Sequence, residues 1–232
     1  MGNRKQGTGN EKQANVCMTP TPATVSPPAH RAVAVRHLRR ADARLAGVIS
    51  AVGRCRLEVR DPNVYRSLFR AVLYQQLAGN AAAAIERRVK ALFGGRVPSP
   101  PRFLSASDAD LRAAGLSRQK LAYLRDLADH FATGRISTRR FHRMPDEEII
   151  AAVTAVKGIG EWTAHMLLLF GLGRPDVLPV GDFGVRKAAQ QLYGLRDLPQ
   201  RDELLRIAEP WRPYRSVASW YLWRSLDVKL PE

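Results

Sequence analysis

Cysteine is scarce in this chain of 232 residues, which contains only Cys17 and Cys55. Two cysteines so far apart supply no disulfide framework, no zinc-ligand spacing and no four-cysteine iron–sulfur loop. The five histidines are scattered along the chain and are not grouped at ligand spacing. The sequence therefore argues against an enzyme built around a transition metal or an iron–sulfur cluster.

Long apolar runs are missing as well. No segment reaches about 18 uncharged apolar residues, and the N-terminal segment lacks the continuous apolar stretch of a signal peptide. Residues 1–30 are rich in Gly, Asn, Gln, Thr and Pro, which favours a flexible tail. The whole chain is 45% hydrophobic, so residues 31–232 can form a domain with a true core. We expect a monomeric cytoplasmic protein that makes no contact with a membrane.

Acidic residues are few compared with basic ones. The chain has 37 Lys and Arg against 21 Asp and Glu, which gives a formal net charge of +16. Such an excess favours a polyanion as partner. An arginine-rich composition can also reflect a general bias and a solvated surface, so charge alone identifies no single contact residue.

Strand patterns are almost absent, and residues 56–59 form the only plausible strand fragment. Apolar residues at helical spacing, separated by Gly, Pro or Ser, predict helices elsewhere. We expect them at residues 35–52, 63–76, 80–93, 107–115, 117–133, 145–157, from 161 onwards, and at 183–193, 201–208 and 214–226. The sequence therefore predicts an all-α domain of two helical lobes with a groove between them.

The most informative segment is VKGIGEWTA, residues 156–164. It lies between two predicted helices, so the pattern is helix, tight hairpin, helix. Gly158 and Gly160 can take positive φ, and they leave backbone N–H groups open at the start of the second helix, where a phosphate binds well. Ile159 can point inward and join the two helices, and we expect His165 at the surface of the second helix. A plain helix–helix turn has the same local pattern, and GxG alone is a weak signal.

These residues resemble the helix-hairpin-helix (HhH-GPD) DNA glycosylase superfamily, and the closest branch is 3-methyladenine DNA glycosylase II. The segment PDVLPVGD, residues 175–182, resembles the loop and catalytic aspartate of the family. Residues 71–77, 111–120 and 215–223 resemble three further signatures. The similarity spans about residues 35–227. It implies a DNA-binding hairpin, with the active site in the groove between the lobes.

The resemblance gives Asp182 the role of catalytic aspartate. Breaking an N-glycosidic bond develops positive charge on the sugar, which a fixed carboxylate stabilises. Aspartate is also a favoured helix N-cap, and local sequence alone favours that simpler role; only the upstream hairpin reverses the balance. Asp176 is the rival carboxylate, and we expect it to be an ordinary loop residue.

The resemblance also implies a base pocket that contains Trp162, Trp223, Tyr74 and Met166. Indole rings stack well on the cationic base of an alkylated purine. Core packing is the competing explanation for Trp162 or Trp223 taken alone. Relatives that also cut the strand carry a lysine where this chain has Trp162, so we expect a monofunctional enzyme.

The remaining functional residues are implied by the family alone. Gln76 matches the position of the wedge that fills the hole left by an extruded base, and Gln75 beside it is the alternative. The DNA contacts of the hairpin are assigned to Lys157, Gly158, Ile159, Gly160 and Thr163. The carbonyls of Val156 and Ile159 would hold a structural Na⁺ or K⁺, and no other cofactor is expected.

The predicted function is removal of alkylated purines, such as 3-methyladenine and 7-methylguanine, from double-stranded DNA at the nucleoid. Two alternatives stay open. One is a glycosylase for a deaminated or oxidised purine. The other is a non-catalytic helix-hairpin-helix module that binds damaged DNA, for which the Asp182 carboxylate would have no use.

Overall fold

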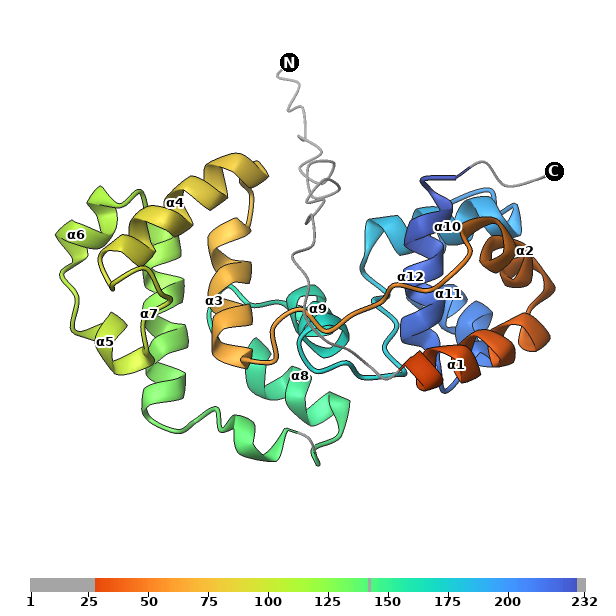
Figure 1. The fold of residues 1–232 in the computed structure, drawn as a ribbon, viewed down its shortest axis with the longest axis horizontal. Coiled ribbons are helices and arrows are strands. Elements are labelled where there is room, and N and C mark those ends of the chain that lie inside the picture. The colour runs from red at the N-terminus through yellow and green to blue at the C-terminus, as the bar shows by residue number, and fades with distance from the viewer. Residues whose placement is uncertain (1–27, 142, 229–232) are drawn as a thin grey trace, which may run out of the picture.

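The structure is a computed structural model that describes residues 28–141 and 143–228 (Figure 1). These residues form twelve α-helices and short 3-10 helices, with no β-strand among them, which confirms the predicted all-α class. Of the predicted tail, residues 1–30, the first 27 residues lie outside the described part of the chain. Residues 28–30 belong to the first helix.

Two hydrophobic cores divide the helices into two lobes, as the sequence predicts (Figure 1). One core lies among α3 (Val64–Tyr74), α4 (Gly79–Ala91), α5 (Pro100–Leu104), α6 (Asp108–Ala113), α7 (Arg118–Ala132), α8 (Asp146–Thr154) and α9 (Glu161–Phe170). The other lies among α1 (Pro28–Ala41), α2 (Ala43–Val52), α10 (Phe183–Tyr193), α11 (Arg201–Ala208) and α12 (Arg215–Ser225). Two 3-10 helices, η2 (Thr138–Arg140) and η3 (Glu209–Trp211), complete the described elements. The chain thus begins in the lobe of α1 and α2, forms the other lobe with α3 to α9, and returns to the first lobe with α10 to α12.

Two segments cross between the lobes, residues 53–63 and 171–182. They lie close together where the Arg60 N–H donates to the carbonyl of Phe170 at 2.7 Å. The predicted strand at residues 56–59 is wrong, because this stretch is the first crossing segment and pairs with no strand in the described chain. Phe170 and Trp223 pack against both cores and so mark the junction of the lobes.

The single helix predicted at residues 35–52 is also wrong, because Asp42 divides it into α1 and α2. The Asp42 carboxylate accepts the Leu45 N–H at 3.0 Å as the N-cap of α2, and it also accepts the indole N–H of Trp211 and the hydroxyl of Tyr193. The backbone of an N-cap residue is not helical, and Asp42 has φ of −150° and ψ of 110°, so the preceding helix ends there. Helix α5 was not predicted, since five residues are too few for helical periodicity to register.

Three places in this fold carry the predicted site residues. They are the end of α3, the hairpin between α8 and α9, and the start of α10. Helix α3 packs against both α7 and α9, which brings the first two places together. Within residues 28–141 and 143–228, no helix is long and apolar enough to cross a membrane.

Candidate active site

Asp182 lies where the second crossing segment enters α10. Its Oδ1 accepts the Val185 N–H at 2.9 Å, which confirms the predicted N-cap, and it also accepts the indole N–H of Trp223 at 2.8 Å. Its Oδ2 accepts the indole N–H of Trp162 at 2.7 Å. A carboxylate has about four lone-pair positions, so three donors fix this one and leave a position for a fourth partner. Residues 20 and 41 positions away from Asp182 thus meet at its carboxylate.

Trp223 is half-buried and stacks on Phe170, with ring centroids 5.8 Å apart and planes inclined by 26°. Gly184 lets the indole approach the carboxylate. A Cβ at this position would stand 2.9 Å from Cδ1 of Trp223 and 3.1 Å from Oδ1 of Asp182. The core-packing explanation for Trp223 therefore holds in part, since the ring packs against both cores, and its N–H also orients the Asp182 carboxylate.

Two large aromatic side chains near the carboxylate are exposed. Trp162 is 46% exposed and Phe183 is 49% exposed. Core packing is therefore wrong as an explanation for Trp162. Few large aromatic residues stand this open in the described chain, so their place beside Asp182 marks a surface that can receive a flat ligand. Phe183 was missed from the sequence, although an aromatic residue directly after the aspartate was a visible signal.

Asp176 is the loop residue that the sequence predicts. Its carboxylate is paired with two arginines, since Arg215 donates from Nε at 2.7 Å and Arg212 donates from Nη1 at 2.8 Å. Arg215 is itself buried. A carboxylate neutralised in this way anchors the second crossing segment to α12, and Asp182 is left as the carboxylate beside the aromatic residues.

The hairpin uses its two glycines for different reasons. Gly158 has φ of +79°, and a Cβ there would stand 2.2 Å from the ring of Tyr123, so glycine is required by packing within the protein. The sequence predicts the positive φ of Gly158 but gives no sign of its packing against Tyr123. Gly160 has φ of −98° and open space around it, and it starts α9 without a side-chain cap. Ile159 is 4% exposed and joins the two helices, as predicted.

The other residues assigned to the hairpin differ in accessibility. Lys157 is exposed, and its N–H donates to Oδ2 of Asp126 at 2.8 Å. The side chain of Thr163 is buried, so a contact between Thr163 and DNA would have to use its backbone. Met166 is half-buried and packs against the core of its lobe. His165, expected at the surface, is buried, and burial lowers the pKa of its imidazole.

The turn after α3 carries both wedge candidates. Gln75 is tied to the hairpin, because its Nε2 donates to the Gly158 carbonyl at 2.8 Å. Gln76 is exposed and has φ of +56°, a left-handed conformation that is uncommon outside glycine. Tyr74 was predicted in the base pocket, but its hydroxyl donates to Glu86 at 2.8 Å within the pair α3 and α4. That hydrogen bond ties the Tyr74 hydroxyl to its own lobe.

The two carbonyls assigned to a monovalent cation belong to the hairpin turn. The Val156 carbonyl accepts the Ile159 N–H at 3.1 Å, which leaves it a second lone pair. No group of His, Cys, Asp and Glu side chains suited to a metal ion occurs in the described residues.

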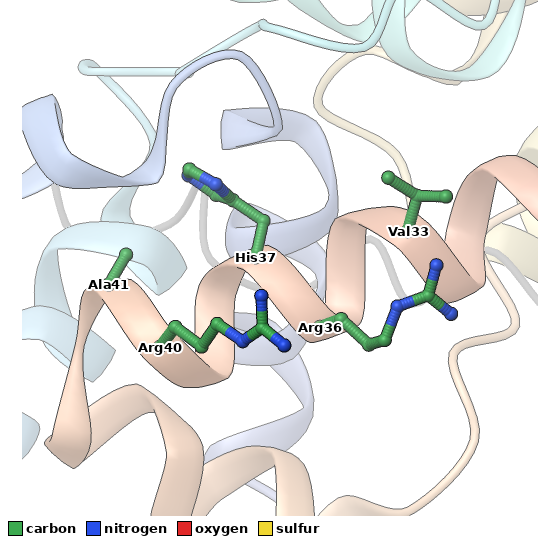
Figure 2. Close-up of a pocket in the computed structure, with 5 residues that line it drawn as sticks. All are labelled: Val33, Arg36, His37, Arg40 and Ala41. Atoms are coloured by element: carbon green, nitrogen blue, oxygen red, sulfur yellow. The ribbon is translucent and has the colours of Figure 1, made fainter.

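A separate open hollow lies on α1, lined by Val33, Arg36, His37, Arg40 and Ala41 (Figure 2). Its two arginines extend along the outer face of the helix. None of the predicted site residues belongs to it.

The geometry defines a class: an all-helical protein in which a glycine hairpin and a carboxylate held by two indoles lie at the junction of two lobes. A family model described as HhH-GPD superfamily base excision DNA repair protein matches residues 69–213. The chain belongs to this superfamily, as its motifs indicate.

Relatives and solved structures agree with this assignment. The chain is 35% identical to DNA-3-methyladenine glycosylase 1 of Schizosaccharomyces pombe over 195 residues, which cover 82% of this chain and 85% of the relative. A solved structure of S. pombe 3-methyladenine DNA glycosylase in complex with abasic DNA matches with a TM-score of 0.75 and 32% identity, covering 86% of this chain and 99% of that one. DNA-3-methyladenine glycosidase from Bacillus halodurans matches with a TM-score of 0.76 and 37% identity, covering 86% and 89%.

Proposed function

We propose that this protein is a monofunctional DNA glycosylase of base excision repair that hydrolyses the N-glycosidic bond of alkylated purines in double-stranded DNA. The observation that carries the proposal is the Asp182 carboxylate, held by the indole N–H groups of Trp162 and Trp223 beside an exposed aromatic surface. The names of the similar proteins, which are 3-methyladenine glycosylases, support the substrate class.

The chemistry follows from the charge of the substrate. An N3- or N7-alkylated purine is cationic, so its bond to C1′ breaks with the electron pair passing to the base, which becomes neutral. The sugar is left as an oxocarbenium ion, which the fixed negative charge of Asp182 stabilises. Water then adds to C1′, and its proton passes to the carboxylate or to solvent. The lone-pair position that the three donors leave free can orient this water.

The exposed aromatic residues supply the base pocket. Trp162 and Phe183 present open ring surface next to the carboxylate, and a cationic purine stacks favourably on such rings. Met166 lies one helical turn after Trp162 and can narrow the pocket. No lysine stands at position 162 to form a Schiff base with the sugar, so the strand should stay uncut.

The hairpin and the turn after α3 supply the DNA contacts. The backbone N–H groups at the start of α9 are open to a phosphate at Gly160, and the exposed Lys157 adds positive charge. Gln76 is the better wedge candidate, since Gln75 is occupied by the Gly158 carbonyl. The strained backbone of Gln76 also agrees with a functional role, because such strain is concentrated at functional sites.

The hairpin also has the chemistry to hold Na⁺ or K⁺. Neutral backbone oxygens suit a hard monovalent cation, and the Val156 and Ile159 carbonyls would hold it. The Gly158 carbonyl is already engaged by Gln75. A bound cation would supply positive charge towards a nearby phosphate.

The direct experiment is incubation of the protein with dimethyl sulfate-treated duplex DNA, followed by chromatography of the released bases. We expect free 3-methyladenine and 7-methylguanine, together with abasic sites that break only after alkali. Release of a deaminated or oxidised purine alone would reassign the lesion. Strand cleavage without alkali would contradict the monofunctional mechanism, and no release from any lesion would favour a DNA-binding module.

A further inference from the structure

Lys120 makes an unusual contact with the end of α3. From α7, its ammonium group donates three hydrogen bonds to backbone carbonyls, at 2.8 Å to Val72, 2.8 Å to Leu73 and 2.7 Å to Gln75. An ammonium group has three N–H donors, so all of them are used. The carbonyls at a helix C-terminus lack partners within the helix, and a cation there is favoured by the helix dipole. Lys120 therefore closes the end of α3.

The contact reaches beyond α3 into the turn that carries the wedge candidate. The Gln75 carbonyl belongs to the peptide that joins Gln75 to Gln76, and Gln76 has φ of +56°. A non-glycine residue keeps such a conformation only where its surroundings fix it. The hydrogen bond from Lys120 fixes the peptide plane directly before the strained residue, and so sets the direction in which the Gln76 side chain leaves the backbone.

The same face of α7 also holds the hairpin. Tyr123 packs its ring against Gly158, and Asp126 accepts the Lys157 N–H at 2.8 Å. Lys120, Tyr123 and Asp126 are spaced three residues apart, which places them along one side of the helix. Gln75 links the two DNA-facing segments, because its side chain donates to the Gly158 carbonyl. Helix α7 thus sets the distance between the turn after α3 and the hairpin.

The partial burial of Lys120 makes its position costly. Lys120 is half-buried, and burial lowers its pKa to about 8. Its partners are carbonyl oxygens, which carry no charge to compensate. A helix end on a surface needs no buried ammonium group, since water satisfies its carbonyls. The three hydrogen bonds offset the cost of burying the charge, and they hold the turn in one conformation.

We infer that Lys120 is a positioning residue for base extrusion, which holds the turn at Gln75 and Gln76 so that the wedge enters the duplex in register with the hairpin. This inference rests on the proposed glycosylase function. It assigns Lys120 no contact with the reacting atoms. Replacing Lys120 should therefore slow excision mainly for lesions that must be extruded from a stable base pair.

The test compares single-turnover excision of 7-methylguanine from two duplexes, one with the lesion paired with cytosine and one with the lesion opposite an abasic site. Lys120→Met keeps the aliphatic stem and removes the three donors. We expect excision of the paired lesion to fall about tenfold or more, and of the unpaired lesion less than about threefold, because an unpaired base costs little to extrude. Lys187→Met, a lysine in the other lobe, is the matched control and should match wild type on both duplexes.

A double-mutant cycle with Gln76→Ala separates positioning from general stabilisation. If Lys120 acts through the wedge, Lys120→Met should add little to the loss caused by Gln76→Ala. Should Lys120→Met fail to fold, Lys120→Arg takes its place, since it keeps the charge but is too long for the three carbonyls. We expect its excision rate to fall less than that of Lys120→Met, and again more for the paired lesion than for the unpaired one. Equal losses on both duplexes, or none, would overturn the inference. No excision by wild type on either duplex would instead refute the proposed function.

Discussion

Gly158→Ala tests the packing that underlies the hairpin. An added Cβ would stand 2.2 Å from Cδ2 and 2.4 Å from Cε2 of Tyr123, which no real Cβ contact allows. The residue would also keep φ of +79°, a conformation that costs a residue with a Cβ roughly 1–2 kcal/mol. Forcing extra atoms into a packed site costs about 1–3 kcal/mol more. We therefore expect the free energy of unfolding to fall by about 2–5 kcal/mol.

Gly160→Ala is the matched control, since it makes the same chemical change two residues away. Gly160 has φ of −98°, and no other side chain or backbone atom lies within 4 Å of the place that a Cβ would take, so its cost should stay within about 1 kcal/mol. Urea denaturation of both variants, followed by circular dichroism, measures the difference. Equal stabilities for the two variants would refute the reasoning, because they would mean that the Tyr123 ring does not need the space left by the absence of a Cβ at position 158.

Three further predictions concern other parts of the site. Gly160→Asp puts negative charge at the open start of α9, so gel-shift affinity should fall equally for damaged and undamaged duplexes; a fall for alkylated duplexes alone would argue against a phosphate contact. Trp223→Phe keeps a ring against Phe170 but removes the N–H that donates to Asp182, so excision should slow about tenfold with duplex affinity unchanged; an unchanged rate would show that this hydrogen bond is not needed. Burial, opposed by Glu161 and assisted by Arg201, holds the pKa of His165 below 6.5, so the unfolded chain binds more protons than the native protein between the two pKa values. The free energy of unfolding should therefore be highest above pH 6.5 and decline as pH falls towards the lowered pKa, and His165→Gln should remove that decline; parallel pH profiles for the two proteins would contradict it.

Much of the helical architecture could be predicted because it depends on local patterns. Apolar spacing located most helices, and the helix starts predicted at residues 63 and 117 coincide with the N-caps of α3 and α7. The errors arose where a single side chain overrides the pattern. Asp42 divides one predicted helix because its carboxylate serves Trp211 and Tyr193, which are more than 150 residues away, as well as its own cap. Local periodicity carries no information about such partners.

The sequence assigned Trp162 and Trp223 to the same site as Asp182, but their hydrogen bonds to its carboxylate could not be predicted. The sequence left Asp182 open as a helix cap or as the catalytic carboxylate. The structure shows the cap and adds two indole N–H donors that no local pattern indicates. The sequence placed His165 at the surface, because helical phase alone does not say which flank a neighbouring helix covers. Lys120 stood in a recognised motif, yet three carbonyl partners 45 to 48 residues away are visible only in three dimensions.

Asp182→Asn tests most directly whether the negative charge of Asp182 drives excision. The Asn Oδ1 can keep the hydrogen bonds from Val185 and Trp223, so the helix cap survives, while its amide cannot accept from Trp162. Melting temperature and duplex affinity should therefore change little.

The measurement is single-turnover release of 7-methylguanine from a duplex by wild type and by Asp182→Asn. If the carboxylate supplies about 3–4 kcal/mol in the transition state, the rate should fall by roughly two to three powers of ten. Equal rates for two folded proteins that bind DNA equally well would contradict the assignment of Asp182 as the catalytic carboxylate.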